Sequence, residues 1–563
     1  MKQPYQTQIE RLSEWVYNLK FEDLPADVLV LARIQVLDAL AAICAGSKSS
    51  VGVRLRRALS KLDSQESCTG IATDRLWSLE NAIYWHSAMI NSLELDNFAF
   101  MGHFTESSFS VAFSVAEFLD KSSDDFLLAM VAAQEASGRI SAYLSSGPQQ
   151  GHMRAFVHRT AGAVATAKLL GLNSYATAQA LAMALSMPEY PVYAASYSAD
   201  TKVICTAAPA VEGMKAAFLA AEGLDAPLDV IEHPVGFMTS FSYLSWMPDI
   251  WRKIGQSWLT YTLSFKKYAT CAYAQGPVNA AVKVFEQGGY SVEAIKKIEV
   301  FSPLTTVVLE AFSTPHYNAG FTPVNTNFST KRSVAAALVF GPITGSFYAH
   351  GKFEQKIPAF RKLADRVELI HDWGLTINLV RGIDQGLENP GMPGVLSTGS
   401  ANAQLNKFKA AFGSRRLFQW NDIGQFLKMD RADRNYFFRR ALRSLRSKLP
   451  IWPGAGDKTQ YLSSEGDLRA MTFPLGGRVR ILLEDGRELI QSSYIPSGFV
   501  GDPDRKEVAL EKYRREASTV WTAARTQLIA TTVQTMKNLP VREFAQLLQQ
   551  PSKATVENPV LIL

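Results

Sequence analysis

Several short polar stretches of this sequence hold residues that could move protons and hold an anion. Asp96 and His103 lie close together in LELDNFAFMGHFTESS, a polar connection that precedes an apolar segment. An imidazole titrates near neutral pH and a carboxylate can orient it, so this pair suits general acid–base catalysis. We expect the connection to be a loop that a rigid scaffold holds in place.

A second stretch, GHMRAFVHRTAGAVATAKLLGL, places two histidines at the start of an alanine-rich run. Such a run predicts a buried helix. His152 would lie near the first turn, where the amide groups and the positive end of the helix dipole disfavour an imidazolium. A neutral imidazole base is therefore predicted at His152.

Lysines mark two further stretches. Lys202 precedes a small-residue helix in DTKVICTAAPAVEGMKAAFLAAEGL, and a lysine at a helix entrance can meet an anionic ligand. Lys266 and Cys271 lie in LSFKKYATCAYAQGP, where the pattern of the chain changes. Taken alone, each of these residues has a plain alternative as a structural or surface side chain.

Helices are expected to position these residues up to about residue 260. Residues 25–46 have apolar residues at helical spacing, with Gly46 as the expected C-terminal cap. Segments that begin near Thr105, Ser122 and Asn173 repeat the pattern of polar capping residues followed by an apolar helix. The fold class is therefore predicted to be mainly α, with a large all-helical domain over 1–262.

Beyond residue 262 the pattern is mixed. It predicts a helix near 277–287, a strand in KKIEVFSP, and a hairpin around Asp485-Gly486. These signals indicate a smaller α+β lid domain over 263–500. Helical patterns resume over 501–563, and we expect them to return to the helical domain.

The net charge of +6 is concentrated in one part of the chain. Residues 401–450 hold twelve Lys or Arg against three Asp, inside a basic helical insertion at about 385–470. A solvated helix face explains such a run, and an acidic partner, a polyanion or a subunit contact are the alternatives. Because the basicity is local, nucleic acid is not expected as a partner.

The cysteines and the apolar runs indicate in which cellular compartment the protein is expected. The four cysteines show no C-x-x-C spacing, which argues against a structural zinc or an iron–sulfur cluster and favours a reduced, cytoplasmic compartment. The uncharged run at 333–351 is broken by Gly341-Pro342 and Gly345, so no membrane span is expected there. The first residues lack the apolar core of a signal peptide.

Taken in order, these motifs resemble a known family. ELDNFAFMGHFTESS, GHMRAFVHRTAGAVATAKLLGL and DTKVICTAAPAVEGMKAAFLAAEGL are similar to successive motifs of the MmgE/PrpD family, which includes 2-methylcitrate dehydratase, cis-aconitate decarboxylase and iminodisuccinate epimerase. The resemblance continues through LSFKKYATCAY, FSTKRSVAAALVFG and GRVRILLEDGRELIQSSYIPSGFVGDPD. It covers most of the chain apart from the insertion, and the shared order is more specific than any one motif.

The resemblance implies two groups of site residues. The implied catalytic residues are Asp96, His103, His152 and Lys202. The implied substrate-binding residues are Lys266, Cys271 and Arg332. The sequence also departs from the family pattern: Asn97 replaces a second acid, Gln275 stands where many members have a histidine, and Arg332 stands where many have a tyrosine. The half of the site that faces the lid is therefore expected to differ from that of other members.

The family's substrates are small polycarboxylates, and its reactions pass through a carbanion-like centre beside a carboxylate. The resemblance thus implies a cofactor-independent, dehydratase-like lyase that abstracts a proton next to a carboxylate, with His103 and His152 dividing the acid and base roles and the lysines holding carboxylates. An isomerase, epimerase or decarboxylase is the alternative, and a non-catalytic ligand-binding relic is the second. No metal, no cofactor and no membrane contact are expected, and a homodimer is implied.

Overall fold

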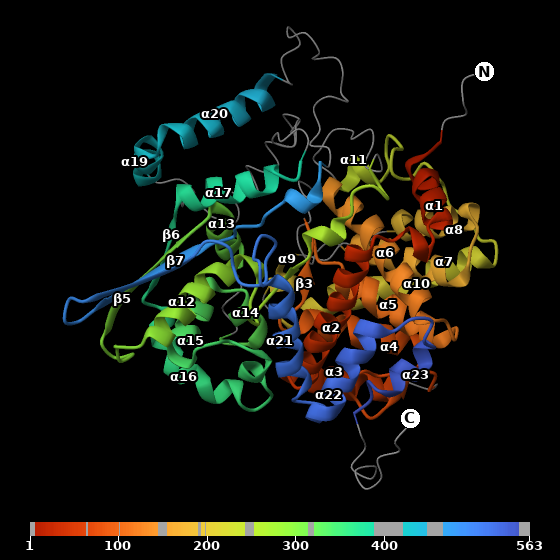
Figure 1. Cartoon of the computed structure of the whole chain (residues 1–563), viewed down its shortest axis with the longest axis horizontal. Coiled ribbons are helices and arrows are strands. Elements are labelled where there is room, and N and C mark those ends of the chain that lie inside the picture. The colour runs from red at the N-terminus through yellow and green to blue at the C-terminus, as the bar shows by residue number, and fades with distance from the viewer. Residues whose placement is uncertain are drawn as a thin grey trace.

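Ten of the eleven α-helices that the structure describes in the chain's first half contribute side chains to one apolar core (Figure 1). The computed structural model describes residues 6–62, 66–100, 102–144, 155–187, 189, 193–197, 199–241, 253–313, 320–387, 420–446 and 466–550. The helices are α1 (Gln8–Asn18), α2 (Ala26–Ser47), α3 (Ser50–Leu62), α4 (Leu79–Ser92), α5 (Thr105–Phe118), α6 (Ser123–Leu144), α7 (Ala155–Leu170), α8 (Ser174–Ser186), α9 (Tyr193–Tyr197), α10 (Ile204–Ala221) and α11 (Phe237–Phe241).

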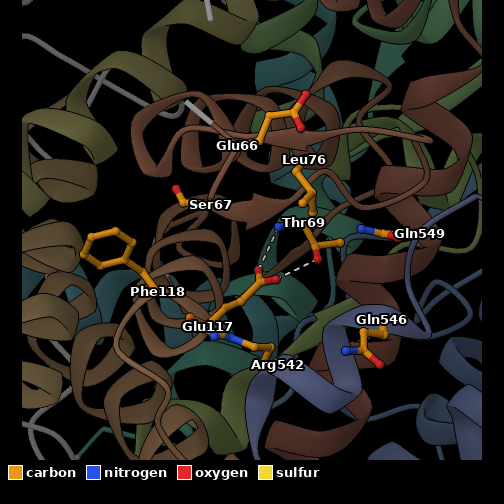
Figure 2. Close-up of a pocket in the computed structure, with 9 residues that line it drawn as sticks. All are labelled: Glu66, Ser67, Thr69, Leu76, Glu117, Phe118, Arg542, Gln546 and Gln549. Carbon is orange, nitrogen blue, oxygen red and sulfur yellow. Dashed lines mark hydrogen bonds between the residues drawn. The ribbon is translucent and has the colours of Figure 1, made fainter. Parts of the chain in front are cut away.

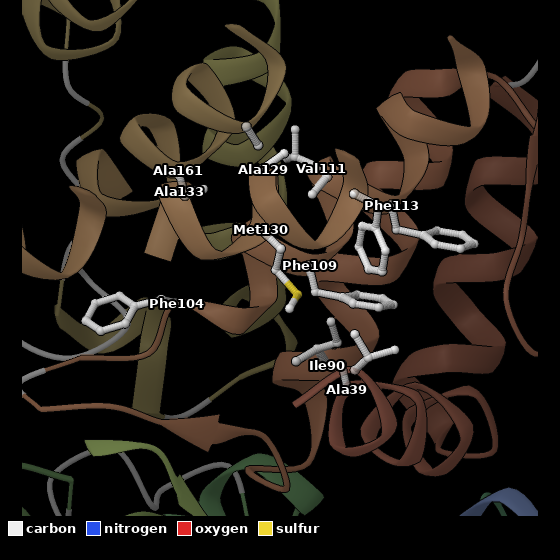
Figure 3. Close-up of a cluster of buried hydrophobic side chains, with 14 of the residues drawn as sticks. Ala39, Ile90, Phe104, Phe109, Val111, Phe113, Ala129, Met130, Ala133 and Ala161 are labelled. Atoms are coloured by element: carbon white, nitrogen blue, oxygen red, sulfur yellow. The ribbon is translucent and has the colours of Figure 1, made fainter. Parts of the chain in front are cut away.

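Helix α5 lies among α4, α6 and α7 at the centre of this body. Its aromatic side chains fill the core, where Phe109 and Phe113 stack with ring centroids 5.6 Å apart (Figure 3). Short residues such as Ala129, Ala133 and Ala161 line the neighbouring helices and let their backbones come close (Figure 3). The alanine-rich runs of the sequence are thus the surfaces on which large aromatic rings pack.

Gly46 is not the C-terminal cap that the sequence suggested. It lies inside α2, which continues to Ser47. A Cβ added at Gly46 would lie 2.5 Å from the Met89 carbonyl oxygen and from Ser92 Oγ, both on α4. The glycine is therefore needed for the close packing of α2 on α4.

Among the residues that the structure describes, two segments are long and apolar enough to span a membrane by composition, α2 and residues 200–221. The protein itself buries 83% of the apolar window of the first and 67% of the second. Their apolar character is thus explained by packing inside the helical body.

The second part of the chain contains a four-stranded sheet with the strand order β6-β5-β7-β8. Its strands are β5 (Ile295–Ser302), β6 (Val367–His371), β7 (Gly477–Leu483) and β8 (Glu488–Ser493). Strand β5 is parallel to β6 and antiparallel to β7, and the β7–β8 hairpin turns at Gly486, whose φ is +85°. The predicted strand and the predicted hairpin are both confirmed.

Helices pack against this sheet and against each other. Helix α12 packs on β7 and β8 and contacts α15, while α13 contacts β5 and β6. The helices of this part are α12 (Gln275–Gln287), α13 (Leu304–Ser313), α14 (Pro323–Asn327), α15 (Thr330–Phe340), α16 (Phe353–Ala364) and α17 (Trp373–Asp384). Together with the helical body, they confirm a mainly α fold with a smaller α+β part.

The last helices of the described chain pack on the first ones. Helix α21 (Arg505–Ala517) contacts α2 along its length, α22 (Ala523–Thr535) also contacts α2, and α23 (Val541–Gln546) contacts α5. In Figure 1 these helices, coloured blue, lie against the red helices of the N-terminal part. Buried Lys512 of α21 pairs with Asp38 of α2 at 2.7 Å and so links the two ends of the chain.

The described part of the basic insertion is a pair of helices, α19 (Trp420–Lys428) and α20 (Arg431–Arg446), that lies against α17 (Figure 1). The Trp373 and Phe426 rings pack with centroids 5.1 Å apart, and Arg381 pairs with Asp433 at 2.6 Å. The helical pattern predicted for this window is thus found in α19 and α20, whereas residues 388–419 and 447–465 lie outside the described part.

Candidate active site

The loop between α4 and α5 carries the centre of the candidate site. It includes the two-residue strand β3 (Asn97–Phe98), which pairs antiparallel with β4 (Ser264–Phe265), so that Asn97 faces Phe265. Asp96 and Lys266 are the next residues along the two strands and therefore lie opposite each other. This pairing explains why residues from two distant parts of the chain meet.

Two buried lysines hold two buried carboxylates at this point. Lys266 Nζ lies 2.9 Å from Glu94 Oε2 and 3.0 Å from Asp96 Oδ1, and Lys202 Nζ lies 2.8 Å from Glu94 Oε1. All four side chains are fully buried. Lys202 also donates to the Asn91 carbonyl at the end of α4. Two ammonium groups balance two carboxylates, and this pairing offsets the free-energy cost of burying the charges.

Backbone geometry contributes to the arrangement. Glu94 has a φ of +55°, in the left-handed region that side chains other than glycine rarely adopt. This conformation follows directly after α4 and turns the chain so that Glu94 and Asp96 both face Lys266. Strain held at a buried charged residue is typical of functional sites.

His103 completes the chain of contacts. Its Nδ1 lies 2.5 Å from Asp96 Oδ2, and its side chain is 13% exposed, in contrast to the fully buried acids and lysines. Burial alone would raise the pKa of Asp96, but the charges of Lys266 and His103 outweigh burial and hold that pKa below its usual range. An ionised Asp96 accepts the Nδ1 proton, and this tautomer makes Nε2 the basic nitrogen of a neutral ring.

Lys266 is correspondingly held in its charged form. Burial disfavours the ammonium, but Asp96 and Glu94 more than compensate and raise the pKa of Lys266 above its usual value. In the contact chain Lys266–Asp96–His103, the acid orients the imidazole as the aspartate of a hydrolytic triad orients its histidine. Lys266 adds a fixed positive charge on the other side of the acid.

Cys271 belongs to the same neighbourhood. Burial raises the pKa of its thiol well above the ordinary value, and the nearby charge of Glu94 raises it further. A thiol that stays protonated is a poor nucleophile, so its surroundings suit packing or weak hydrogen bonding to a substrate.

Two of the predicted site residues, His152 and Arg332, are not among the described residues of this cluster. His152 lies outside the described residues. Arg332 lies in the first turn of α15, where it donates to Asn325 Oδ1 at 2.6 Å and its guanidinium lies 3.9 Å from the Phe321 ring centroid. These contacts anchor the segment before α15, so a role of Arg332 in substrate binding stays a prediction.

The two remaining departures from the family pattern have structural roles. Asn97 donates to Asp38 Oδ2 at 2.9 Å and accepts from Thr105 Oγ1 at 2.5 Å, which ties the site loop to α2 and α5. Gln275 donates to the carbonyls of Tyr268 and Thr270 at 2.8 Å each and so braces the loop that follows Lys266.

Two acidic residues of the cluster, Glu94 and Glu106, were not singled out from the sequence. Glu94 lies two residues before Asp96, and that proximity was the available signal. Glu106 was interpreted as part of a capping motif, but α5 begins at Thr105, so Glu106 lies in its first turn. It is fully buried there, with Oε1 3.8 Å from His103 Nδ1.

Asp96, His103 and Glu106 could each offer one metal ligand, because these ligand atoms lie within 4.8 Å of one another. The 2.5 Å separation of His103 Nδ1 and Asp96 Oδ2 is that of a hydrogen bond. Two ligands at about 2.1 Å from one ion would lie about 3 Å apart. The cluster as arranged is therefore an acid–base network, and metal binding would require it to open.

A cavity of about 490 Å³ lies elsewhere in the protein (Figure 2). It is bounded by the β1–β2 hairpin (Cys68–Thr69 and Leu76–Trp77), the end of α5, and α23. Its lining residues are Glu66, Ser67, Thr69, Leu76, Glu117, Phe118, Arg542, Gln546 and Gln549. None of the predicted site residues is among them, so this cavity is distinct from the acid–base cluster.

Comparison with known proteins places the cluster in context. Residues 10–245 match the model of the MmgE/PrpD N-terminal domain, and this range includes Asp96, His103 and Lys202. The chain is 27% identical over 290 residues to a cis-aconitate decarboxylase of Aspergillus terreus (strain NIH 2624 / FGSC A1156), which covers 48% of this chain and 59% of that protein. It is 25% identical over 378 residues to a human cis-aconitate decarboxylase, which covers 64% of this chain and 76% of that protein.

A third relative is a cis-aconitate decarboxylase-like protein, oryM, of Aspergillus oryzae (strain ATCC 42149 / RIB 40), 27% identical over 295 residues. That match covers 48% of this chain and 60% of the relative. The chain thus matches less than two thirds of the length of these fungal relatives.

Proposed function

The chain belongs to the MmgE/PrpD family, and from this premise we propose that it is a cofactor-independent lyase acting on a small polycarboxylate. The observation that supports this proposal most strongly is the contact chain Lys266–Asp96–His103, in which a fixed cation holds an acid and the acid holds an imidazole. Such a chain supplies an oriented imidazole base beside a preorganised positive charge.

In the proposed reaction, His103 Nε2 exchanges a proton with the substrate. In a dehydration, it accepts the proton from the carbon next to a carboxylate, and the electron pair forms the double bond as hydroxide leaves with a proton from a second acid. Asp96 stabilises the resulting imidazolium through Nδ1. By resemblance His152 is the candidate for the second acid.

Lys202 and Lys266 act mainly through their charge. Their ammonium groups already contact Glu94, Asp96 and the Asn91 carbonyl, so they neutralise the buried acids that would otherwise repel an anionic substrate. A direct contact with a substrate carboxylate would require Lys202 to turn away from Glu94. The sequence suggested that the lysines hold carboxylates of the substrate. That role remains a proposal, and it requires the movement of Lys202 just described.

Decarboxylation is the second candidate, and the names of the relatives favour it. In that reaction the carbon–carbon bond to a carboxylate breaks, carbon dioxide leaves, and the electron pair stays on carbon. His103 would then deliver its proton to that carbon. Both reactions use the same contact chain, so the geometry of the site supports a lyase without selecting between them.

The experiment is a proton NMR time course in D₂O with purified full-length protein and candidate acids, including cis-aconitate and 2-methylcitrate. Decarboxylation incorporates deuterium at the carbon that lost carbon dioxide, dehydration yields an alkene and water, and epimerisation exchanges the α-hydrogen without losing either. Lack of turnover of every tested acid, combined with thermal stabilisation by one of them, would contradict the lyase and favour a ligand-binding protein.

A further inference from the structure

The first turn of α5 places a second carboxylate against His103. Glu106 Oε1 lies 3.8 Å from His103 Nδ1, the nitrogen that also contacts Asp96 Oδ2 at 2.5 Å. Asn91 of α4 donates its amide to the same Glu106 oxygen at 3.3 Å. The Nδ1 edge of the imidazole is therefore faced by two carboxylates, and the position of Glu106 is fixed by a neighbouring helix.

The two carboxylates have different electrostatic surroundings. Asp96 contacts the ammonium of Lys266 at 3.0 Å, and Glu106 lies within ion-pair distance of His103. Burial raises the pKa of Glu106 to about 7, the charge of Asp96 raises it as well, and His103 and Lys266 only partly oppose this. Near neutral pH Glu106 thus changes its protonation state while Asp96 stays ionised.

A buried carboxyl this close to an imidazole titrates together with it. Ionised Glu106 stabilises a positive charge on the His103 ring, and protonated Glu106 does not. Lys266 contributes positive charge and Asp96 negative charge at neutral pH, because the pKa of Lys266 is raised and that of Asp96 is lowered. Beside Asp96 and Lys266, burial thus makes Glu106 a carboxylate whose charge varies around pH 7.

We propose that Glu106 is a positioning residue that shares one exchangeable proton with His103 and thereby sets how readily the ring accepts or donates a proton. The catalytic part of this inference rests on the proposed function, and it assigns to Glu106 the control of proton affinity at His103. In a decarboxylation the proton on His103 Nε2 goes to carbon and water restores it after product release, whereas in a dehydration Nε2 takes the proton from carbon and passes it to water after product release. At neutral pH the shared proton is thus available to His103 for the reaction.

The same helix offers a matched control. Glu117 is the other buried glutamate of α5, and burial raises its pKa too. Its oxygens accept from Thr69 N at 2.9 Å and Thr69 Oγ1 at 2.7 Å, and it lines the separate cavity of Figure 2. Glu117→Gln therefore removes a buried carboxylate from α5 without changing what faces His103.

The test follows the His103 ring signals by NMR as a function of pH in the full-length protein without substrate. In the wild type we expect two coupled steps. In Glu106→Gln we expect one step, moved to lower pH by about one unit or more, which is a tenfold loss of proton affinity, because a stabilising negative charge is gone. Glu117→Gln should leave the two steps in place, and Glu106→Asp should restore them in part.

Coincident titration curves for the wild type and Glu106→Gln would overturn the proposal. If Glu106→Gln does not fold, infrared spectroscopy of folded Glu117→Gln must still show a buried carboxylic acid band that disappears near pH 7, and its absence would also overturn the proposal. With an active substrate, the pH profile of kcat/KM should lose one step in Glu106→Gln. An inactive wild type with coupled titration would refute the lyase alone, whereas an active enzyme with uncoupled titration would refute only the role of Glu106.

Discussion

Replacing Lys266 by methionine tests whether the buried charge network is as tightly balanced as the contacts indicate. Lys266 lies 2.9 Å from Glu94 and 3.0 Å from Asp96, and all three are fully buried. Methionine keeps much of the volume of the lysine stem but leaves two buried carboxylates with one cation fewer. Breaking a buried pair in this way costs about 3–5 kcal/mol.

This cost can be converted into a melting temperature. An unfolding entropy of about 2.1 cal/mol/K per residue gives roughly 1.2 kcal/mol/K for a chain of this length, so Lys266→Met should lower Tm by about 3–4 °C if the chain unfolds as one unit. Lys267→Met is the matched control. Lys267 is partly exposed and lies 5.9 Å from the Tyr268 ring centroid, a contact that contributes about 1 kcal/mol or less.

The pH dependence has a defined sign. Although burial opposes the charge, Asp96 and Glu94 raise the pKa of Lys266, so its stabilisation is complete below the unfolded pKa of about 10.4 and is lost only as pH rises through the folded pKa. The pKa of Asp96 is held low despite burial, so its stabilisation is present above about pH 3.9 and is lost as pH falls through the folded pKa.

Without Lys266 the two carboxylates take up protons at higher pH. The Tm difference between Lys266→Met and the wild type should therefore be largest at pH 7–8 and shrink towards pH 5, as measured by differential scanning calorimetry. Equal losses in Lys266→Met and Lys267→Met, or a difference that grows towards acid pH, would refute the reasoning.

Further changes test the other features. Once a substrate is found, His103→Ala or Lys202→Ala should each lower kcat/KM by ~10² or more, and near-wild-type values in both would contradict the proposed roles. Gly46→Ala should destabilise the protein by about 1–3 kcal/mol through overpacking, whereas Gly424→Ala in α19, where an added Cβ meets no atom within 4 Å, should be neutral or stabilising. If α20 is a solvated face, the full chain should not bind a polyanion at any salt concentration in a filter-binding titration. Retention that weakens steeply with salt would instead indicate a polyanion site.

The sequence allowed the mainly α fold and much of the site to be predicted. Apolar spacing and caps located several helices, including α2, α5, α6 and α8 with Asn173 as its cap, and the KKIEVFSP strand and the β7–β8 hairpin were found from turn and β-branched residues. Asp96 and Lys266 were expected in one site, and their side chains are in contact.

Glu94 and Glu106 could not be found by the same reasoning. Glu94 joins the cluster through a left-handed backbone conformation, which no local pattern indicates. Glu106 follows a threonine and looks like part of a cap, and only the exact start of α5 places it inside the first turn. Strands β3 and β4 are two residues long each, too short to show a period, yet their pairing brings Lys266 to Asp96.

The β3–β4 pairing also sets an order of assembly. The range that matches the N-terminal domain model stops at residue 245, before β4 and Lys266, so a polypeptide that ends there holds Glu94 and Asp96 but not the cation that bridges them. During synthesis Glu94 can already pair with Lys202, but the ribosome must deliver Lys266 before Asp96 gains its lysine partner. The loop between α4 and α5 thus reaches its final arrangement late in synthesis, and a separately produced N-terminal fragment should not hold this loop in a fixed conformation at neutral pH.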